Sequence, residues 1–219
     1  MEVIHAPKAH PENLLAIIQA VREARVVVPE FQRSFVWARE DIEELFVSIL
    51  QGYFVGTFLM LDTPTNAPMF PFRIIEGLET VGPDARPNNH TTVRLILDGQ
   101  QRITSVFYAL YEPDIPLKWA QYPHRFYLRL EDALAGDLEE AVVGVSARDR
   151  SRMAEIQRLV GADRALPLSA LRDPNAFLEW LYDKQTTWKA DERKAIQAIY
   201  QRFQTFMVPV VSLLAETVA

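Results

Sequence analysis

One short segment constrains the fold of this chain more than any other: residues 95–104 read Leu-Ile-Leu-Asp-Gly-Gln-Gln-Arg-Ile-Thr. An apolar run typical of a buried strand meets an Asp-Gly turn. Asp-Gly alone also fits a hairpin, but the apolar residues after it recur with the period of a helix, at Ile103, Val106, Phe107 and Leu110. We therefore predict a strand that ends near Asp98 and a helix over residues 100–111.

The polar residues at this predicted strand-to-helix junction point to an anionic ligand. The start of a helix presents backbone N–H groups without intrahelical acceptors and the positive end of the helix dipole. Gly99 lets the backbone approach a ligand, and Arg102 can bind a phosphate through its guanidinium group. We expect Gln100 and Gln101 to reach the same ligand, with Gln101 pointing away from the core. The alternative is a solvated first turn with a surface arginine.

A second candidate segment, residues 29–37, places Gln32 and Arg33 between aromatic side chains. Arg33 could bind phosphate in a bidentate manner, or it could form a surface ion pair with the acidic residues that follow. The aromatic residues could stack on a base or a sugar, but we expect at least two of the three to lie in the core: Phe31, Phe35 and Trp37. We predict that Gln32 and Arg33 line the same pocket as Arg102.

Composition excludes several classes of function. The chain has 219 residues and is 49 % apolar, enough for a packed core, and it contains no cysteine, which excludes disulfides, thiolate zinc sites and cysteine nucleophiles. The net charge of −6 argues against general binding of polyanions, so any nucleotide or DNA must use a local basic site. Without a signal peptide or an apolar run long enough for a bilayer, we expect a cytoplasmic protein with no membrane association.

The order of elements predicts an α+β fold, divided into a core over residues 1–130 and a mostly helical subdomain with a terminal strand over residues 131–219. The alternative for this terminal strand is that it returns to the sheet of the core. Pro11 suits the first turn of an N-terminal helix, and Pro209 suggests that the last strand lies at a sheet edge. We expect strands over residues 25–28, 54–61, 92–97, 124–130 and 206–214. We expect helices from residues 11 and 40 onward, and over residues 100–111, 137–143, 151–160, 174–182 and 191–206.

Three ordered segments resemble the motifs of a known family. Residues 28–37 resemble the signature IPxYQRxYvW, residues 45–56 resemble LldSIlrGyPiG, and residues 98–104 resemble DGQQRLT. Together they resemble the bacterial domains of unknown function at the N-terminus of GmrSD-type (GmrS-like) type IV restriction enzymes and related phage-defence proteins that sense modified DNA.

This resemblance implies a core with the ParB/sulfiredoxin-like fold, a small mixed sheet with helices. It also implies binding and hydrolysis of a nucleoside triphosphate, and we expect Mg²⁺ as the cofactor bound with it. The residues that it implies for catalysis are Asp98, Gln100, Gln101 and Arg102. Those that it implies for binding the nucleotide and its phosphates are Gly99, Arg102, Thr104, Gln32 and Arg33.

The resemblance further implies that some of the same residues read a modification of foreign DNA: Phe31, Gln32, Arg33 and Arg102. Two carboxylates are candidates for Mg²⁺, Asp98 and Glu30. We weigh three functions: a nucleotide-hydrolysing sensor in which Arg102→Ala abolishes turnover but not folding, a DNA reader without hydrolysis, and a ParB-like nuclease.

The chain departs from the family pattern in places. Phe31 stands where many members have tyrosine, and Phe54-Val55 replaces the frequent Pro-Ile. Family members usually continue after a strand like residues 207–213 with an iFxxiNxxG segment, and often with an HNH nuclease. We expect either a truncated chain or a minimal sensor with a separate nuclease partner, not DNA cleavage by these residues alone. An oligomer remains compatible with the sequence.

Overall fold

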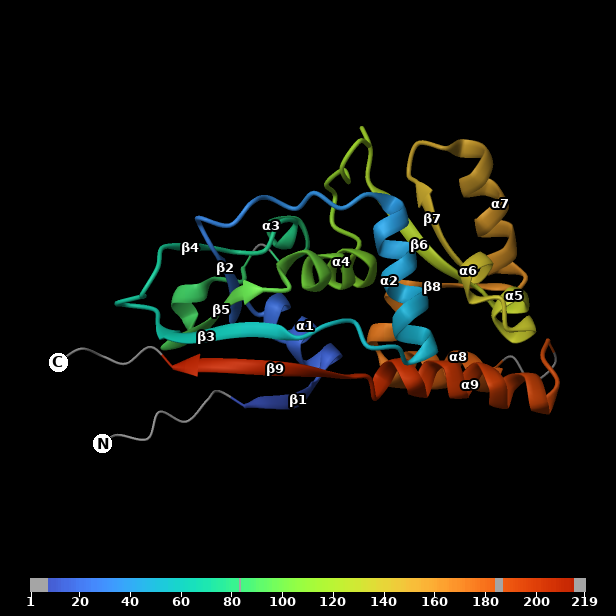
Figure 1. Ribbon diagram of the computed structural model, residues 1–219. Coiled ribbons are helices and arrows are strands. Elements are labelled where there is room, and N and C mark those ends of the chain that lie inside the picture. Colours follow the sequence, from blue (N-terminus) through green and yellow to red (C-terminus); the bar gives the residue numbers. More distant parts are fainter. Residues whose placement is uncertain (1–7, 83, 184–186, 215–219) are drawn as a thin grey trace. The chain divides into compact units, whose positions relative to one another are not determined.

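The computed structural model describes residues 8–82, 84–183 and 187–214 (Figure 1). Their contacts divide the chain into two units. The first unit contains residues 8–35, the described part of 56–104, and residues 207–214, and the second contains residues 36–55 and the described part of 105–206. This division differs from a single boundary at residue 130, because residues 36–55 join the later part of the chain. The last strand joins the earlier part, which agrees with the alternative that it returns to the sheet of the core.

The first unit is built on a six-stranded mixed sheet, which together with the helices confirms the α+β class. The strand order is β1-β9-β3-β5-β2-β4. The pairs β9/β3 and β5/β2 are parallel, and the other neighbours are antiparallel. The strands are β1 (Ala9–Asn13), β2 (Val26–Pro29), β3 (Phe58–Pro64), β4 (Phe72–Arg73), β5 (Thr92–Asp98) and β9 (Met207–Leu214).

Apolar residues from neighbouring strands form a core cluster in this unit: Val27, Leu61, Val93 and Leu95. The amphipathic helix α1 (Leu14–Arg22) buries the apolar face predicted for it, at Leu14, Ile17, Ile18 and Val21. The other helices of the unit are α3 (Leu78–Val81), the 3₁₀ helix η1 (Pro87–Asn89) and the first residues of α4 (Gln100–Tyr111).

Both proline-based predictions were wrong. Pro11 lies in β1, and α1 begins only at Leu14, where the side chain of Asn13 accepts a hydrogen bond from the backbone N of Ala16 (3.1 Å). β9 is an inner strand rather than an edge, since it pairs with both β1 and β3. Pro209 is tolerated there because it faces Pro11 across the ladder and the pairing with β3 starts one residue later, at Val210.

The second unit contains a three-stranded antiparallel sheet in the order β7-β6-β8, surrounded by helices. The helix predicted over residues 137–143 was wrong in its last two residues, because the β-branched residues from Val142 onward pair with β6 instead. The strands are β6 (His124–Arg129), β7 (Val142–Ser146) and β8 (Ala165–Pro167). The helices are α2 (Arg39–Gln51), the rest of α4, α5 (Leu130–Ala135), α6 (Leu138–Ala141), α7 (Arg150–Gly161), η2 (Leu168–Arg172), α8 (Pro174–Asp183) and α9 (Ala190–Gln204).

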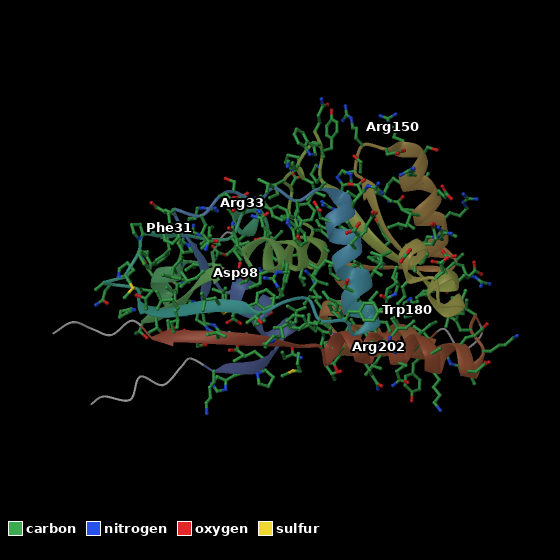
Figure 2. All side chains as sticks on the ribbon, in the orientation of Figure 1. Phe31, Arg33, Asp98, Arg150, Trp180 and Arg202 are labelled. Atoms are coloured by element: carbon green, nitrogen blue, oxygen red, sulfur yellow. The ribbon has the colours of Figure 1, made fainter. Side chains whose placement is uncertain are left out.

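Helices α2 and α9 lie against each other within this unit. The rings of Phe46 and Phe203 stack with centroids 5.9 Å apart. The guanidinium of Arg202, labelled in Figure 2, donates a hydrogen bond to the carbonyl oxygen of Leu50 (2.7 Å), so a cation sits at the negative end of α2. Among the described residues, no helix combines the length and apolarity that crossing a membrane requires.

Candidate functional site

The junction between β5 and α4 is the strand-to-helix turn that the sequence predicts. β5 ends at Asp98 and α4 begins at Gln100, and Gly99 between them has φ +93°. A Cβ at position 99 would also overlap the buried ring of Phe58, so glycine is required for conformation and for space. The first intrahelical hydrogen bond runs from the N of Ile103 to the O of Gly99 (3.1 Å). The backbone N–H groups before Ile103 therefore have no acceptor within the helix.

The two glutamines of this turn hold a neighbouring segment instead of extending into solvent. The Nε2 of Gln100 donates to the carbonyl of Arg33 (3.0 Å), and the Nε2 of Gln101 donates to that of Ser34 (3.1 Å). Only 6 % of Gln100 and 9 % of Gln101 is exposed, so the expectation that Gln101 points away from the core was wrong. Both amides therefore fasten the motif around Arg33 to the start of α4.

Further side chains fasten the same segment from other sides. The Nε2 of Gln32 donates to the carbonyls of Ile96 (2.7 Å) and Leu97 (2.8 Å) on β5. The guanidinium of Arg73 donates to the carbonyls of Arg33 (3.2 Å) and, at 3.4 Å, Gln32. Residues 32–34 lie outside regular helix or strand, so these side chains take the place of a backbone ladder.

A carboxylate completes the set of contacts. The Glu76 carboxylate accepts from the backbone N of Phe35 (3.0 and 3.1 Å) and from the guanidinium of Arg73 (3.1 Å). Sequence reasoning missed Arg73 and Glu76. Their one signal is an opposite-charge pair three residues apart in a stretch rich in proline and glycine. We call residues 32–35, held by these contacts, the tethered segment.

Arg102 lies on the other flank of the helix start. Its guanidinium donates to the carbonyl of Thr57 (3.2 Å), pairs with the carboxylate of Asp98 (3.4 Å) and lies 4.8 Å from the ring centroid of Phe58. Gly56, at φ +91°, leaves the space for it, because a Cβ there would overlap the Nη1 of Arg102. About a fifth of the side chain stays exposed (21 %), so a ligand can still reach a positioned cation.

The side chains of Phe31 and Arg33 remain exposed (Figure 2). Arg33 forms no ion pair with any residue that the structure describes. Phe31 is 66 % exposed, and its ring meets that of Phe70 edge-on with centroids 5.3 Å apart. Phe35 and Trp37 are only partly buried. The expectation that two of the three aromatic residues lie in the core was therefore wrong.

The comparisons with known proteins agree with the motifs. The model of the GmrSD restriction endonuclease N-terminal domain matches residues 14–218. The chain belongs to this family. An uncharacterized protein of Methanocaldococcus jannaschii is 36 % identical over 190 residues, which cover 83 % of this chain and 32 % of that protein. The chain thus spans about a third of the length of this curated relative.

Family membership confirms the resemblance inferred from the three motifs and relates the chain to restriction of DNA. Within the first unit, two of these motifs meet: the tethered segment lies on one flank of the start of α4, and Arg102 lies on the other. A pocket shared by Gln32, Arg33 and Arg102 stays a prediction, as does the ParB/sulfiredoxin-like fold.

The remaining predicted site residues differ in accessibility. Thr104 is buried, which argues against contact between its hydroxyl and a phosphate, so that contact stays a prediction. Asp98 and Glu30 are both exposed. Within the described residues, no three His, Asp or Glu side chains gather in a way that could hold a metal ion. These residues therefore offer no complete protein site for Mg²⁺. They fit the common arrangement in which one or two carboxylates bind Mg²⁺ together with the phosphate oxygens of a nucleotide.

Glu76→Gln is expected to loosen the tethered segment without disturbing the rest of the fold. The substitution removes the charge that strengthens the bonds to Phe35 and Arg73, and we expect the free energy of unfolding to fall by about 1 kcal/mol. Hydrogen exchange of the Phe35 amide should become faster than in the wild type. Glu79→Gln, at an exposed residue with only a 3.4 Å contact to the N of Gly77, is the matched control. Equal exchange at Phe35 in both variants would contradict this role of Glu76.

Proposed function

We propose that the first unit binds a nucleoside triphosphate and hydrolyses it, as a sensor of modified foreign DNA in a restriction system. The observation that supports this proposal is the meeting of two motifs at one helix start. The amides of Gln100 and Gln101 hold the main chain beside Arg33, while Arg102 is held on the opposite flank. Backbone amides and two guanidinium groups around a helix start suit a polyphosphate.

The proposed roles follow from what each side chain contacts. Arg33 and Arg102 would neutralise phosphate charge, and such positioning and charge stabilisation supply most of the catalysis of phosphoryl transfer. The Nε2 groups of Gln100 and Gln101 donate to carbonyl oxygens, so we assign both glutamines as positioning residues. Asp98 would contribute an exposed carboxylate to Mg²⁺ bound with the nucleotide, whose charge would assist the phosphate leaving group.

The test is release of inorganic phosphate by the purified chain. ATP, GTP, CTP and UTP are each supplied with Mg²⁺, alone, with unmodified DNA and with DNA that carries modified bases. We expect release above the buffer background for at least one nucleotide, and a change in rate when modified DNA is added. Absence of release from all four nucleotides under all three conditions would contradict hydrolysis.

A second candidate function is a DNA reader that does not hydrolyse nucleotide. The exposed ring of Phe31 favours it, because an aromatic face beside the cationic Arg33 can stack on a base while the arginine contacts a phosphate. DNA binding that depends on Phe31, without phosphate release, would support this reader and exclude the hydrolase. The family is described as the N-terminal domain of an endonuclease, so we propose that a different domain or a partner, such as an HNH nuclease, cuts the DNA.

A further inference from the structure

The loop between α4 and β6 in the second unit carries an exposed aromatic pair. This loop, residues 112–123, is the yellow-green segment that rises from the end of α4 in Figure 1. Trp119 is 87 % exposed, and Tyr122 is also exposed. Trp119 has φ +64°, a left-handed conformation that a bulky residue rarely adopts. Strained backbone conformations cluster at active sites and ligand-binding sites.

Each of the two rings has a cation beside it. The Nζ of Lys118 lies 4.8 Å from the ring centroid of Trp119, and the Cζ of Arg148 lies 5.1 Å from that of Tyr122. Arg148 comes from the turn after β7, which the pairing of His124 with Ser146 brings next to the loop. We call these four residues the aromatic–cation surface: Lys118, Trp119, Tyr122 and Arg148.

The base of the loop is firmly held, so the surface is presented on a stable support. The hydroxyl of Tyr108 donates to the carbonyl of Ile115 (2.7 Å) and accepts from the N of His124 (3.0 Å). The N of Lys118 donates to the carbonyl of Trp37 (3.2 Å). These bonds anchor the start, the middle and the end of the loop, and they lower the entropy that a ligand must overcome to order it.

The charged groups beside the two rings are both cationic, which favours an anionic ligand there, and the loop also carries the exposed Asp114. Glu112, an acidic residue at the start of the loop, is engaged by the hydroxyl of Ser169 (3.0 Å) and by Arg125 (3.8 Å). Lys118 and Arg148 form no ion pair with a described residue. Between the two rings in the sequence stand the small, partly buried Ala120 and the polar, exposed Gln121. This spacing suits separate bases better than the continuous apolar face that lipid requires.

We propose that the aromatic–cation surface binds nucleic acid whose bases are unstacked, either single-stranded or locally opened. Trp119 and Tyr122 stack on neighbouring bases, and Lys118 and Arg148 contact the phosphates between them. A base inside a regular duplex offers no free face to these rings, so a duplex binds more weakly. This inference rests on DNA as the proposed partner but is independent of nucleotide hydrolysis, and it assigns a DNA contact to the second unit.

The test is the binding of a fluorescently labelled oligodeoxythymidine of about twelve nucleotides, a length within the usual range for such surfaces. Fluorescence anisotropy gives the dissociation constant for the full chain and for a duplex of the same length. We expect Trp119→Ala to weaken binding of the single strand about tenfold, which corresponds to the loss of one stacked base. The matched control is Tyr53→Ala, which removes another exposed ring (61 %) in the same unit. It should bind as the wild type does.

Salt dependence separates stacking from charge. For single strands, the slope of log K against log salt is about −0.7 for each phosphate neutralised. Lys118→Ala and Arg148→Ala should each make that slope less negative by about 0.7. Trp119→Ala should lower the affinity and leave the slope unchanged.

Equal affinity of Trp119→Ala and the wild type would overturn the proposal, and so would binding of the duplex as tightly as the single strand. No detectable binding of the oligonucleotide by the wild type would also overturn it. Tryptophan fluorescence of the full chain tests lipid as the ligand instead. If anionic phospholipid vesicles shift the emission and the oligonucleotide does not, the proposal is overturned. Phosphate release without DNA tests hydrolysis separately, so failure of this inference and failure of the proposed hydrolase can be told apart.

Discussion

Arg102→Ala is expected to reduce NTP hydrolysis by about a hundredfold to a thousandfold, the usual effect of removing one charge-stabilising donor from an active site. The guanidinium is held by the carbonyl of Thr57, the carboxylate of Asp98 and the face of Phe58. Such a held cation loses little entropy when it meets a phosphate. The variant should still fold, because the side chain is partly exposed and its ion pair with Asp98 is of the surface type, worth about 1 kcal/mol or less.

Two variants make the Arg102 experiment decisive. Arg102→Lys keeps the charge but cannot bind a phosphate in a bidentate manner, so we expect an intermediate rate. Arg150→Ala, at an exposed arginine of α7 in the second unit (Figure 2), removes the same charge far along the chain and should retain the wild-type rate. Phosphate release is the measurement, and circular dichroism verifies folding. Unchanged turnover in a folded Arg102→Ala protein would exclude this residue from catalysis.

Gly99→Val is expected to lower the free energy of unfolding by about 3 kcal/mol or more, from two sources that add. A β-branched residue at φ +93° is strained, which costs about 1–3 kcal/mol. Its Cβ would also overlap the buried ring of Phe58, and such overpacking costs about 1–3 kcal/mol. Urea unfolding measures the sum. Nucleotide turnover should fall as well, because Phe58 also supports Arg102.

The two costs can be separated with a second glycine. Gly136, at the end of α5, has φ +86° but has no atom within 4 Å of where its Cβ would stand. Gly136→Val therefore measures the conformational cost alone, about 1–3 kcal/mol by the same reasoning. A Gly99→Val protein no less stable than Gly136→Val would show that contact with Phe58 does not constrain the turn.

Local pattern was enough to predict the elements that carry the candidate site. The helical spacing of the residues after Gly99 correctly predicted α4 and its buried face, and the apolar run before Asp98 correctly predicted β5. Three motifs were enough to identify the family. These features depend on residues close together in the sequence, where periodicity and turn chemistry are informative.

What the sequence did not reveal depends on contacts between distant residues. The amide of Gln101 was expected to face a ligand, but it finds the carbonyl of Ser34, which is 67 residues away. Pro209 alone indicates an edge strand, and only the structure shows that Pro11 lies opposite it across the ladder. Glu76 has no local pattern that marks it as the acceptor of the Phe35 amide. In each case the deciding neighbour is far away in the sequence, and for Gln101 and Glu76 it is a backbone group, of which sequence spacing carries no record.

The bonds that hold the tethered segment have a consequence for how this family could diversify. Gln100, Gln101 and Arg73 donate to main-chain carbonyls, which every amino acid possesses. Substitution at positions 33 and 34 therefore leaves these acceptors in place, and the exposed side chain at position 31 is not among the anchors. The main-chain bonds would therefore let the side chains that contact a ligand change one at a time during evolution, while the backbone of the tethered segment keeps its position.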